Sequence, residues 1–151
     1  MINKIYTKLR DKFFLATVYD KIFIFGINKI VGKLSLIFFK FIYTNNLKIG
    51  TSIKCWGSVS LRINQNATVT IGNNCTIVSN NNRAGITVFT KFKITALFDS
   101  KIYIGNNVSF NGTSLSCRTS SITIGSGTII GPNVIIVDSD FHGIYPPENR
   151  E

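Results

Sequence analysis

Two patterns of hydrophobic positions divide the chain near residue 48. Before that point, apolar residues recur at intervals of three and four, and after it an aliphatic residue followed by glycine and small polar residues recurs instead. The first pattern predicts amphipathic α-helices over residues 1–48, and the second predicts short β-strands joined by tight turns over residues 49–151. The apolar positions of the helical pattern are Ile27, Ile30, Val31, Leu34, Ile37, Phe38, Phe41 and Ile42.

The second pattern is an internal repeat. Successive Ile-Gly pairs are 22, 33, 20 and 6 residues apart, and they begin at Ile49, Ile71, Ile104, Ile124 and Ile130. Six residues suit one short strand and its turn, which together make one side of a triangular coil. Nothing in a β-sandwich would make Ile-Gly recur near multiples of six, so we expect an all-β, parallel β-helix of hexapeptide repeats.

The repeat also predicts which side chains point inward. The aliphatic residue of each hexad faces the interior, which gives the two sets Ile104, Phe110, Ser116 and Ile124, Ile130, Ile136. A second, smaller residue four positions later also suits the interior, as at Ile53, Val59, Cys75, Val108 and Val134. The 33-residue interval holds an insertion around residues 79–93.

Charge and cysteine content narrow the function classes. Nine of the 17 Lys and Arg residues, but only two of the seven Asp and Glu residues, lie in residues 1–48. The basic charge therefore belongs mainly to the N-terminal segment, which argues against a nucleic-acid partner for the repeats. Three cysteines without metal-ligand spacing indicate a reduced, cytoplasmic chain, and one histidine is too little for a metal site.

The N-terminal segment allows two interpretations. Lys29, Lys33 and Lys40 share the face opposite the apolar residues, and lysines interrupt the apolar runs. This pattern is typical of an interfacial helix, which would give peripheral membrane association through residues 1–44 on the inner face of the plasma membrane. The other interpretation is a helix packed on the β domain or between subunits.

From Asn107 to Arg150 the chain resembles the bacterial hexapeptide-repeat O-acetyltransferases that act on surface-polysaccharide sugars. The resemblance is carried by Asn111-Gly112-Thr113-Ser114, by the hexads from Ile124 to Ile136, and by the stretch from Asp138 to His142. It implies a left-handed β-helix, a homotrimer with active sites between subunits, and transfer of an acetyl group from acetyl-CoA. The acceptor would be a sugar or polysaccharide precursor for capsule, O-antigen or exopolysaccharide.

The resemblance makes His142, the only histidine, the catalytic general base. A neutral imidazole can take the proton that a sugar hydroxyl loses as it attacks a thioester. Asp138 and Asp140 would orient the imidazole or bind a substrate hydroxyl. In the insertion, Asn82 and Arg83 suit hydroxyls and carboxylates of the sugar, although a solvated loop would look the same.

Members of the family continue beyond this histidine with further coils that form the acyl-CoA groove. This sequence ends at Glu151, so the resemblance implies missing C-terminal coils and little turnover by the 151-residue chain alone. The alternative function is a catalytically inactive β-helix remnant or scaffold. An ice-binding solenoid is less consistent with the sequence, because it needs regular outward threonine ladders.

Overall fold

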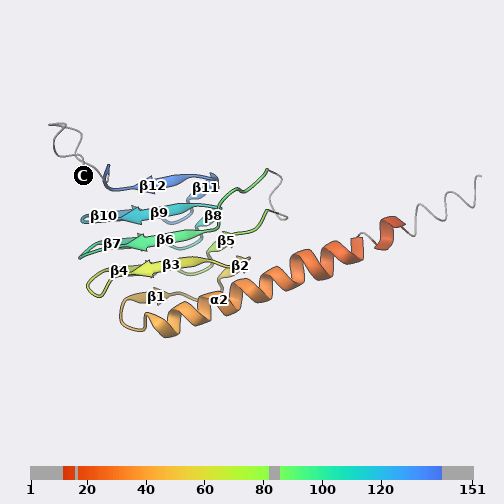
Figure 1. The fold of residues 1–151 in the computed structure, drawn as a ribbon, viewed down its shortest axis with the longest axis horizontal. Helices are drawn as coiled ribbons and strands as arrows, with labels where there is room; N and C mark the ends of the chain where they lie inside the picture. The colour runs from red at the N-terminus through yellow and green to blue at the C-terminus, as the bar shows by residue number, and fades with distance from the viewer. Residues whose placement is uncertain (1–11, 16, 82–85, 141–151) are drawn as a thin grey trace, which may run out of the picture.

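The computed structural model describes residues 12–15, 17–81 and 86–140. Within them the strands form three parallel sheets of four strands each (Figure 1). The first sheet contains β1 (Leu47–Ile49), β4 (Thr68–Ile71), β7 (Lys101–Ile104) and β10 (Ser121–Ile124). The second contains β2 (Lys54–Trp56), β5 (Thr76–Val78), β8 (Ser109–Asn111) and β11 (Ile129–Pro132). The third contains β3 (Ser60–Ile63), β6 (Lys93–Ala96), β9 (Ser114–Cys117) and β12 (Ile135–Val137).

The chain visits the three sheets in turn, so every run of three strands is one coil of a parallel β-helix. Side chains alternate along each strand, with every second residue buried in the first sheet. Equivalent residues of successive coils therefore stack along the axis of the helix. The stacks are Ile49, Ile71, Ile104 and Ile124 in the first sheet; Cys55, Ile77, Phe110 and Ile130 in the second; and Leu61, Ile94, Leu115 and Ile136 in the third.

The predicted inward positions are confirmed at Ile71, Ile104 and Ile124, which are buried, and at Ile130 and Ile136, which pack against the core. The expectation for Ser116 was wrong. Its neighbour Leu115 occupies the inward position and pairs with Ile136, while Ser116 pairs with Val137. The turn before β9 is one residue shorter than the hexad, because Gly112 at φ 52° turns directly into the buried Thr113. A count of six residues from the inward Phe110 therefore reaches Ser116, one residue beyond the inward Leu115.

The corners explain why the chain is rich in asparagine. Between the first and second sheets, the equivalent residues of the four coils all have positive φ, a conformation that Asn and Gly adopt most easily: Ser52, Asn74, Asn107 and Gly127. Next to them, side chains form a ladder between coils. The Asn73 Oδ1 atom accepts from the Thr51 N–H at 2.8 Å, and the Asn106 Oδ1 atom accepts from the Asn73 N–H at 2.8 Å.

The insertion leaves the corner between the second and third sheets, after β5 and before β6. Two buried side chains anchor its described part, since Val88 lies against Gly112 and the Phe92 ring packs on the Phe110 ring at 5.0 Å between centroids. The Asn133 side chain donates to the Thr87 carbonyl at 2.9 Å and accepts from the Phe89 N–H at 2.7 Å. The insertion is thereby tied to the last described coil.

The helical pattern is confirmed by a π-helical segment, η1 (Asp20–Ile27), followed by α2 (Asn28–Ile42). Helix α2 runs across the first coil, where the carbonyl of its first residue, Asn28, accepts from the Gly57 N–H at 2.9 Å, and η1 extends beyond the stack (Figure 1). Its closest approach is at Gly32, where a Cβ atom would overlap the Cys55 carbonyl oxygen. In the described part of the chain, no helix is long and apolar enough to cross a membrane.

Candidate functional site

Asp138 follows β12 at the corner where the last described coil leaves the third sheet. One carboxylate oxygen, Oδ1, accepts from the Arg118 N–H at 2.7 Å. The other, Oδ2, accepts from the N–H groups of Thr119 at 3.0 Å and Ser120 at 2.9 Å, and from the Cys117 thiol at 3.4 Å. These four contacts fix the start of the segment that leads to residues 139–142.

The same contacts set the charge state of this corner. Burial alone would raise the pKa of Asp138, but the hydrogen bonds from the backbone of Arg118, Thr119 and Ser120 and from the Cys117 thiol lower it to about 2. Burial raises the pKa of Cys117, and the Asp138 carboxylate beside it raises it further. Asp138 is therefore ionised at neutral pH, and the raised pKa of Cys117 disfavours the thiolate that nucleophilic chemistry needs.

The other cysteines are unsuited to nucleophilic chemistry as well. Cys55 and Cys75 are buried, and burial raises the pKa of Cys55 to about 12 and also raises that of Cys75. Among the described residues, no group of three His, Cys, Asp or Glu side chains is arranged to hold a metal ion.

Of the other predicted site residues, only Asp140 lies within the described chain, and its side chain is exposed. His142, Asn82 and Arg83 lie outside the described residues. Near Asp138, the Arg118 guanidinium lies 5.9 Å from the centre of the exposed Phe98 ring. The corner thus presents a cation over an aromatic ring next to the anchored carboxylate.

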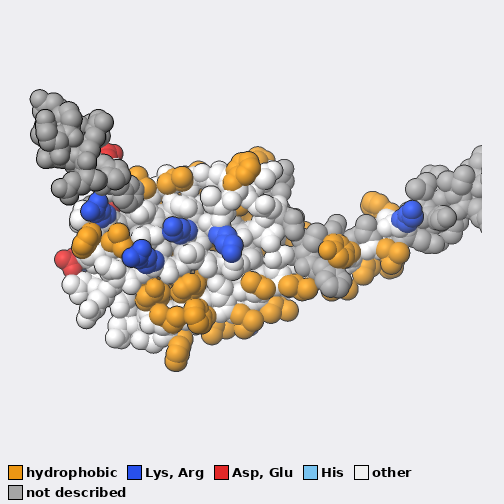
Figure 2. All heavy atoms as spheres, in the orientation of Figure 1, with side chains coloured by type: hydrophobic (Ala, Val, Ile, Leu, Met, Phe, Trp, Pro, Cys, Tyr) orange, Lys and Arg blue, Asp and Glu red, His pale blue; other side chains and the backbone are white. Residues whose placement is uncertain are grey.

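A shallow groove of about 390 Å³ lies along the outer face of the third sheet. Figure 2 shows Lys and Arg side chains spread across the face that this sheet presents. Arg62 and Lys93 contribute the positive charge of the groove, and such side chains can pair with phosphate or carboxylate groups of a ligand. The remaining lining residues are Thr95, Leu97, Ser114, Leu115, Ser116, Ile135 and Val137.

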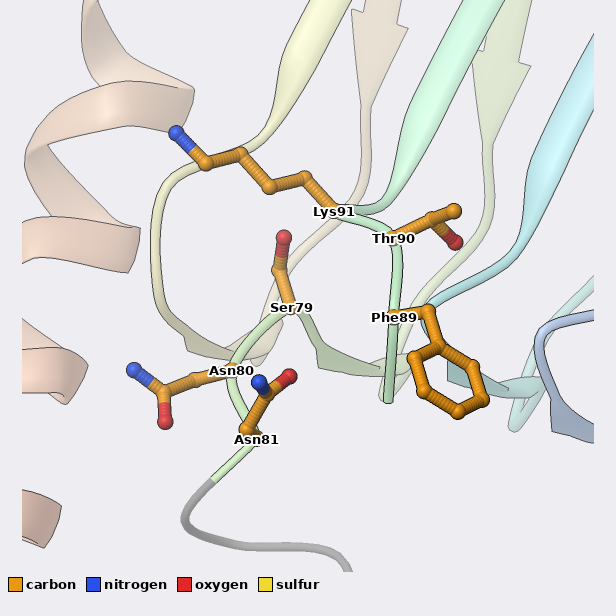
Figure 3. Close-up of a pocket in the computed structure, with 6 residues that line it drawn as sticks. All are labelled: Ser79, Asn80, Asn81, Phe89, Thr90 and Lys91. Carbon is orange, nitrogen blue, oxygen red and sulfur yellow. The ribbon is translucent and has the colours of Figure 1, made fainter. Parts of the chain in front are cut away.

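A second hollow, of about 350 Å³, lies beside the insertion (Figure 3). Several of its polar groups are already used. The Ser79 hydroxyl donates to the Ser58 carbonyl and accepts from the Phe92 N–H, and the Thr90 hydroxyl donates to the Gly112 carbonyl at 2.6 Å. Within the described residues, the groups left to meet a ligand are the Asn81 amide, the Lys91 ammonium and the exposed Phe89 ring.

The two regions singled out by the sequence lie at opposite ends of the third sheet. The insertion leaves the corner between the second and third sheets, which is the corner where β12 begins in the last described coil, whereas Asp138 lies just after β12. At about 3.3 Å per residue, the width of the sheet separates them by roughly 10–15 Å. A single chain therefore does not bring the described part of the insertion and Asp138 together, and the groove runs between them.

The basic groove was not found from the sequence. The sequence does contain a pattern that could have indicated the groove. In β3 and β6, buried aliphatic residues alternate with the outward side chains Arg62, Lys93 and Thr95. The parallel register that places Arg62 opposite Thr95 depends on the length of the insertion, which the repeat does not fix.

Comparison of the chain with known protein families, with curated proteins and with solved structures gives no match.

Proposed function

We propose that this protein is an O-acetyltransferase that moves an acetyl group from acetyl-CoA to a sugar hydroxyl, with His142 as the general base. The observation that carries the proposal is the anchoring of Asp138 by three backbone N–H groups. The motif that resembles the catalytic stretch of this family begins at this residue, at a corner of a parallel β-helix.

The reaction requires two proton transfers, the first from the sugar hydroxyl to His142 and the second from His142 to the CoA sulfur. The sugar hydroxyl oxygen attacks the thioester carbonyl carbon, and the imidazole of His142 takes the hydroxyl proton as the C–O bond forms. The C–S bond then breaks, and the imidazolium returns the proton to the departing CoA sulfur. The products are the acetylated sugar and free CoA, and the histidine ends neutral.

We assign Asp138 a positioning role rather than a direct contact with substrate. An ionised carboxylate has about four acceptor sites, and the Oδ2 atom already accepts three hydrogen bonds here. Asp138 holds the turn at residues 118–120 against the start of the segment that carries His142. Asp140, which is exposed, is the better candidate for a contact with the imidazole or a sugar hydroxyl.

A second subunit would complete the site. The insertion hollow and Asp138 lie apart in one chain, and the groove between them exposes Ile135 and Val137. We propose a left-handed coil and a homotrimer, in which the third sheet faces a neighbour and Arg62 and Lys93 supply charge for the phosphates of acetyl-CoA. The Phe89 ring and the Asn81 amide then suit the acceptor sugar.

Acetyl-CoA turnover with a panel of sugars tests this function. Release of free CoA thiol should depend on a sugar acceptor, and mass spectrometry should find the acetylated sugar. The assay is run on the 151-residue chain and on a version continued by further hexapeptide coils. If neither form binds acetyl-CoA, the protein is a scaffold and the proposal is wrong.

A further inference from the structure

Helix α2 presents three distinct strips along its length. Its packed strip contains Gly32, Leu36 and Phe39, which lie within about 60° of one another at about 100° per residue. This strip rests on the first coil, where Gly32 meets the Cys55 backbone and Leu36 joins the core. The packing therefore uses only one side of the helix.

The opposite strip is apolar and exposed. Phe41 is 79% exposed, and the other members of the strip are all more than half exposed. These side chains lie roughly 140–240° round the helix from Gly32, on the side away from the β-helix, and Ile37, at the 140° edge, also lines the hollow beside the first coil. Figure 2 shows apolar side chains along the helix where it leaves the stack. The strip consists of Ile30, Leu34, Ile37, Phe38 and Phe41, and η1 adds the exposed apolar side chains Ile22, Phe25 and Ile27 before it.

A lysine edge separates the packed strip from the apolar strip on one side of the helix. Lys29, Lys33 and Lys40 lie about 60–100° from Gly32, and all three are exposed. The sequence contains no Asp or Glu between Asp20 and Asp99, so no nearby carboxylate along the chain neutralises these charges. Lys33 and Lys40 also line a hollow between the helix and the first coil, with Leu36, Ile37, Ile49, Gly50, Ser52 and Ile53.

We propose that α2 binds the surface of an anionic lipid bilayer. The apolar strip enters the boundary between headgroups and acyl chains, and the lysine edge contacts the negatively charged headgroups. Exposed apolar residues on ordinary surface are scattered singly, whereas the five in this strip are neighbours, and such a patch marks an interaction site. Charge favours a lipid over a second copy of the chain, because a second copy would bring six lysines together without an acidic partner from either helix.

This placement also orients the β-helix. Helix α2 crosses the first coil, so the first coil faces the membrane and the last described coil faces away from it (Figure 1). The Asp138 corner then lies three coil spacings, about 15 Å, above the first coil. Binding of α2 to a membrane does not require acetyl transfer.

Vesicle cosedimentation with the full chain tests the proposal. Vesicles of phosphatidylglycerol with phosphatidylcholine should bind the protein at least ~10-fold more tightly than phosphatidylcholine alone, and added salt should reduce the difference. Leu34→Glu with Phe41→Glu should abolish binding to both vesicles. Lys33→Glu with Lys40→Glu should weaken binding to the anionic vesicles by ~25-fold or more, at about fivefold per lysine.

Lys101→Glu is the control for reversal of a single lysine charge away from the helix, because Lys101 is exposed on β7, two coils from α2. It should keep affinity within about threefold of the original chain. Equal binding by the original chain and by the Leu34→Glu, Phe41→Glu variant would overturn the proposal. A second outcome would also overturn the proposal: the original chain is a dimer, the Leu34→Glu, Phe41→Glu variant is a monomer, and neither protein binds vesicles. Circular dichroism checks that the variants fold, and Phe38→Gln is the milder substitute if the double variant does not.

Discussion

Replacing Leu115 or Ser116 by alanine tests the register of the third sheet. Leu115 is 1% exposed and stacks between Ile94 and Ile136, whereas Ser116 is partly exposed and lies on the opposite, outer face of the strand. Leu115→Ala removes three buried carbon atoms, worth about 2.4 kcal/mol at 0.8 each, and leaves a cavity that raises the loss to about 3–4 kcal/mol. For a chain of this size, that loss lowers Tm by about 10 °C.

Ser116→Ala is the matched neighbour in the same strand. A substitution on the outer face should change the free energy of unfolding by no more than about 0.5 kcal/mol and Tm by less than about 2 °C. Thermal unfolding followed by circular dichroism measures both variants under one set of conditions. Equal losses, or a larger loss for Ser116→Ala, would show that counting in sixes was right and that Leu115 does not face the core.

Two further predictions concern single contacts. The folded-state pKa of Asp138, about 2, lies below its unfolded value, so its stabilisation is present above about pH 4 and is lost as pH falls towards 2. Asp138→Asn should lower the urea midpoint at pH 7 and remove this part of the acid dependence; identical pH curves would refute the anchor. Gly32→Ala should destabilise the protein by about 1–3 kcal/mol, because its Cβ would overlap the Cys55 backbone. Gly131→Ala, which has open space around it, should be nearly neutral by the same thermal assay, and a matching loss there would contradict this packing.

The architecture could be predicted because the repeat is local and periodic. An aliphatic residue followed by Gly or Asn specifies an inward side chain and then a corner with positive φ, and Ile71, Ile104 and Ile124 obey this rule. The rule fails where a corner changes length, as before Leu115. For α2, the spacing of apolar residues predicted the helix but did not predict which side of it packs on the first coil.

Sequence reasoning placed the lysines of α2 opposite its apolar residues. The structure shows instead that Gly32 and Leu36 define the packed side, and that Lys33 lies on its flank. A glycine carries no hydrophobic signal, so only the close approach of the Cys55 backbone identifies this strip. Likewise, Asp138 could be identified as part of a motif. Its hydrogen-bond partners at residues 117–120 could not be predicted, because they belong to the preceding coil and lie far from Asp138 in the sequence.

The measurement that tests the central claim most directly is the effect of His142→Ala on acetyl transfer to sugar in the form of the protein that turns over acetyl-CoA. A positioned general base accounts for about 10²–10⁴ in rate, so the variant should lose that factor in kcat while its affinity for acetyl-CoA changes little. Thr123→Ala, an exposed position on β10, is the control and should keep the original rate. An unchanged rate in His142→Ala would contradict the account, because it would remove the only histidine from the chemistry.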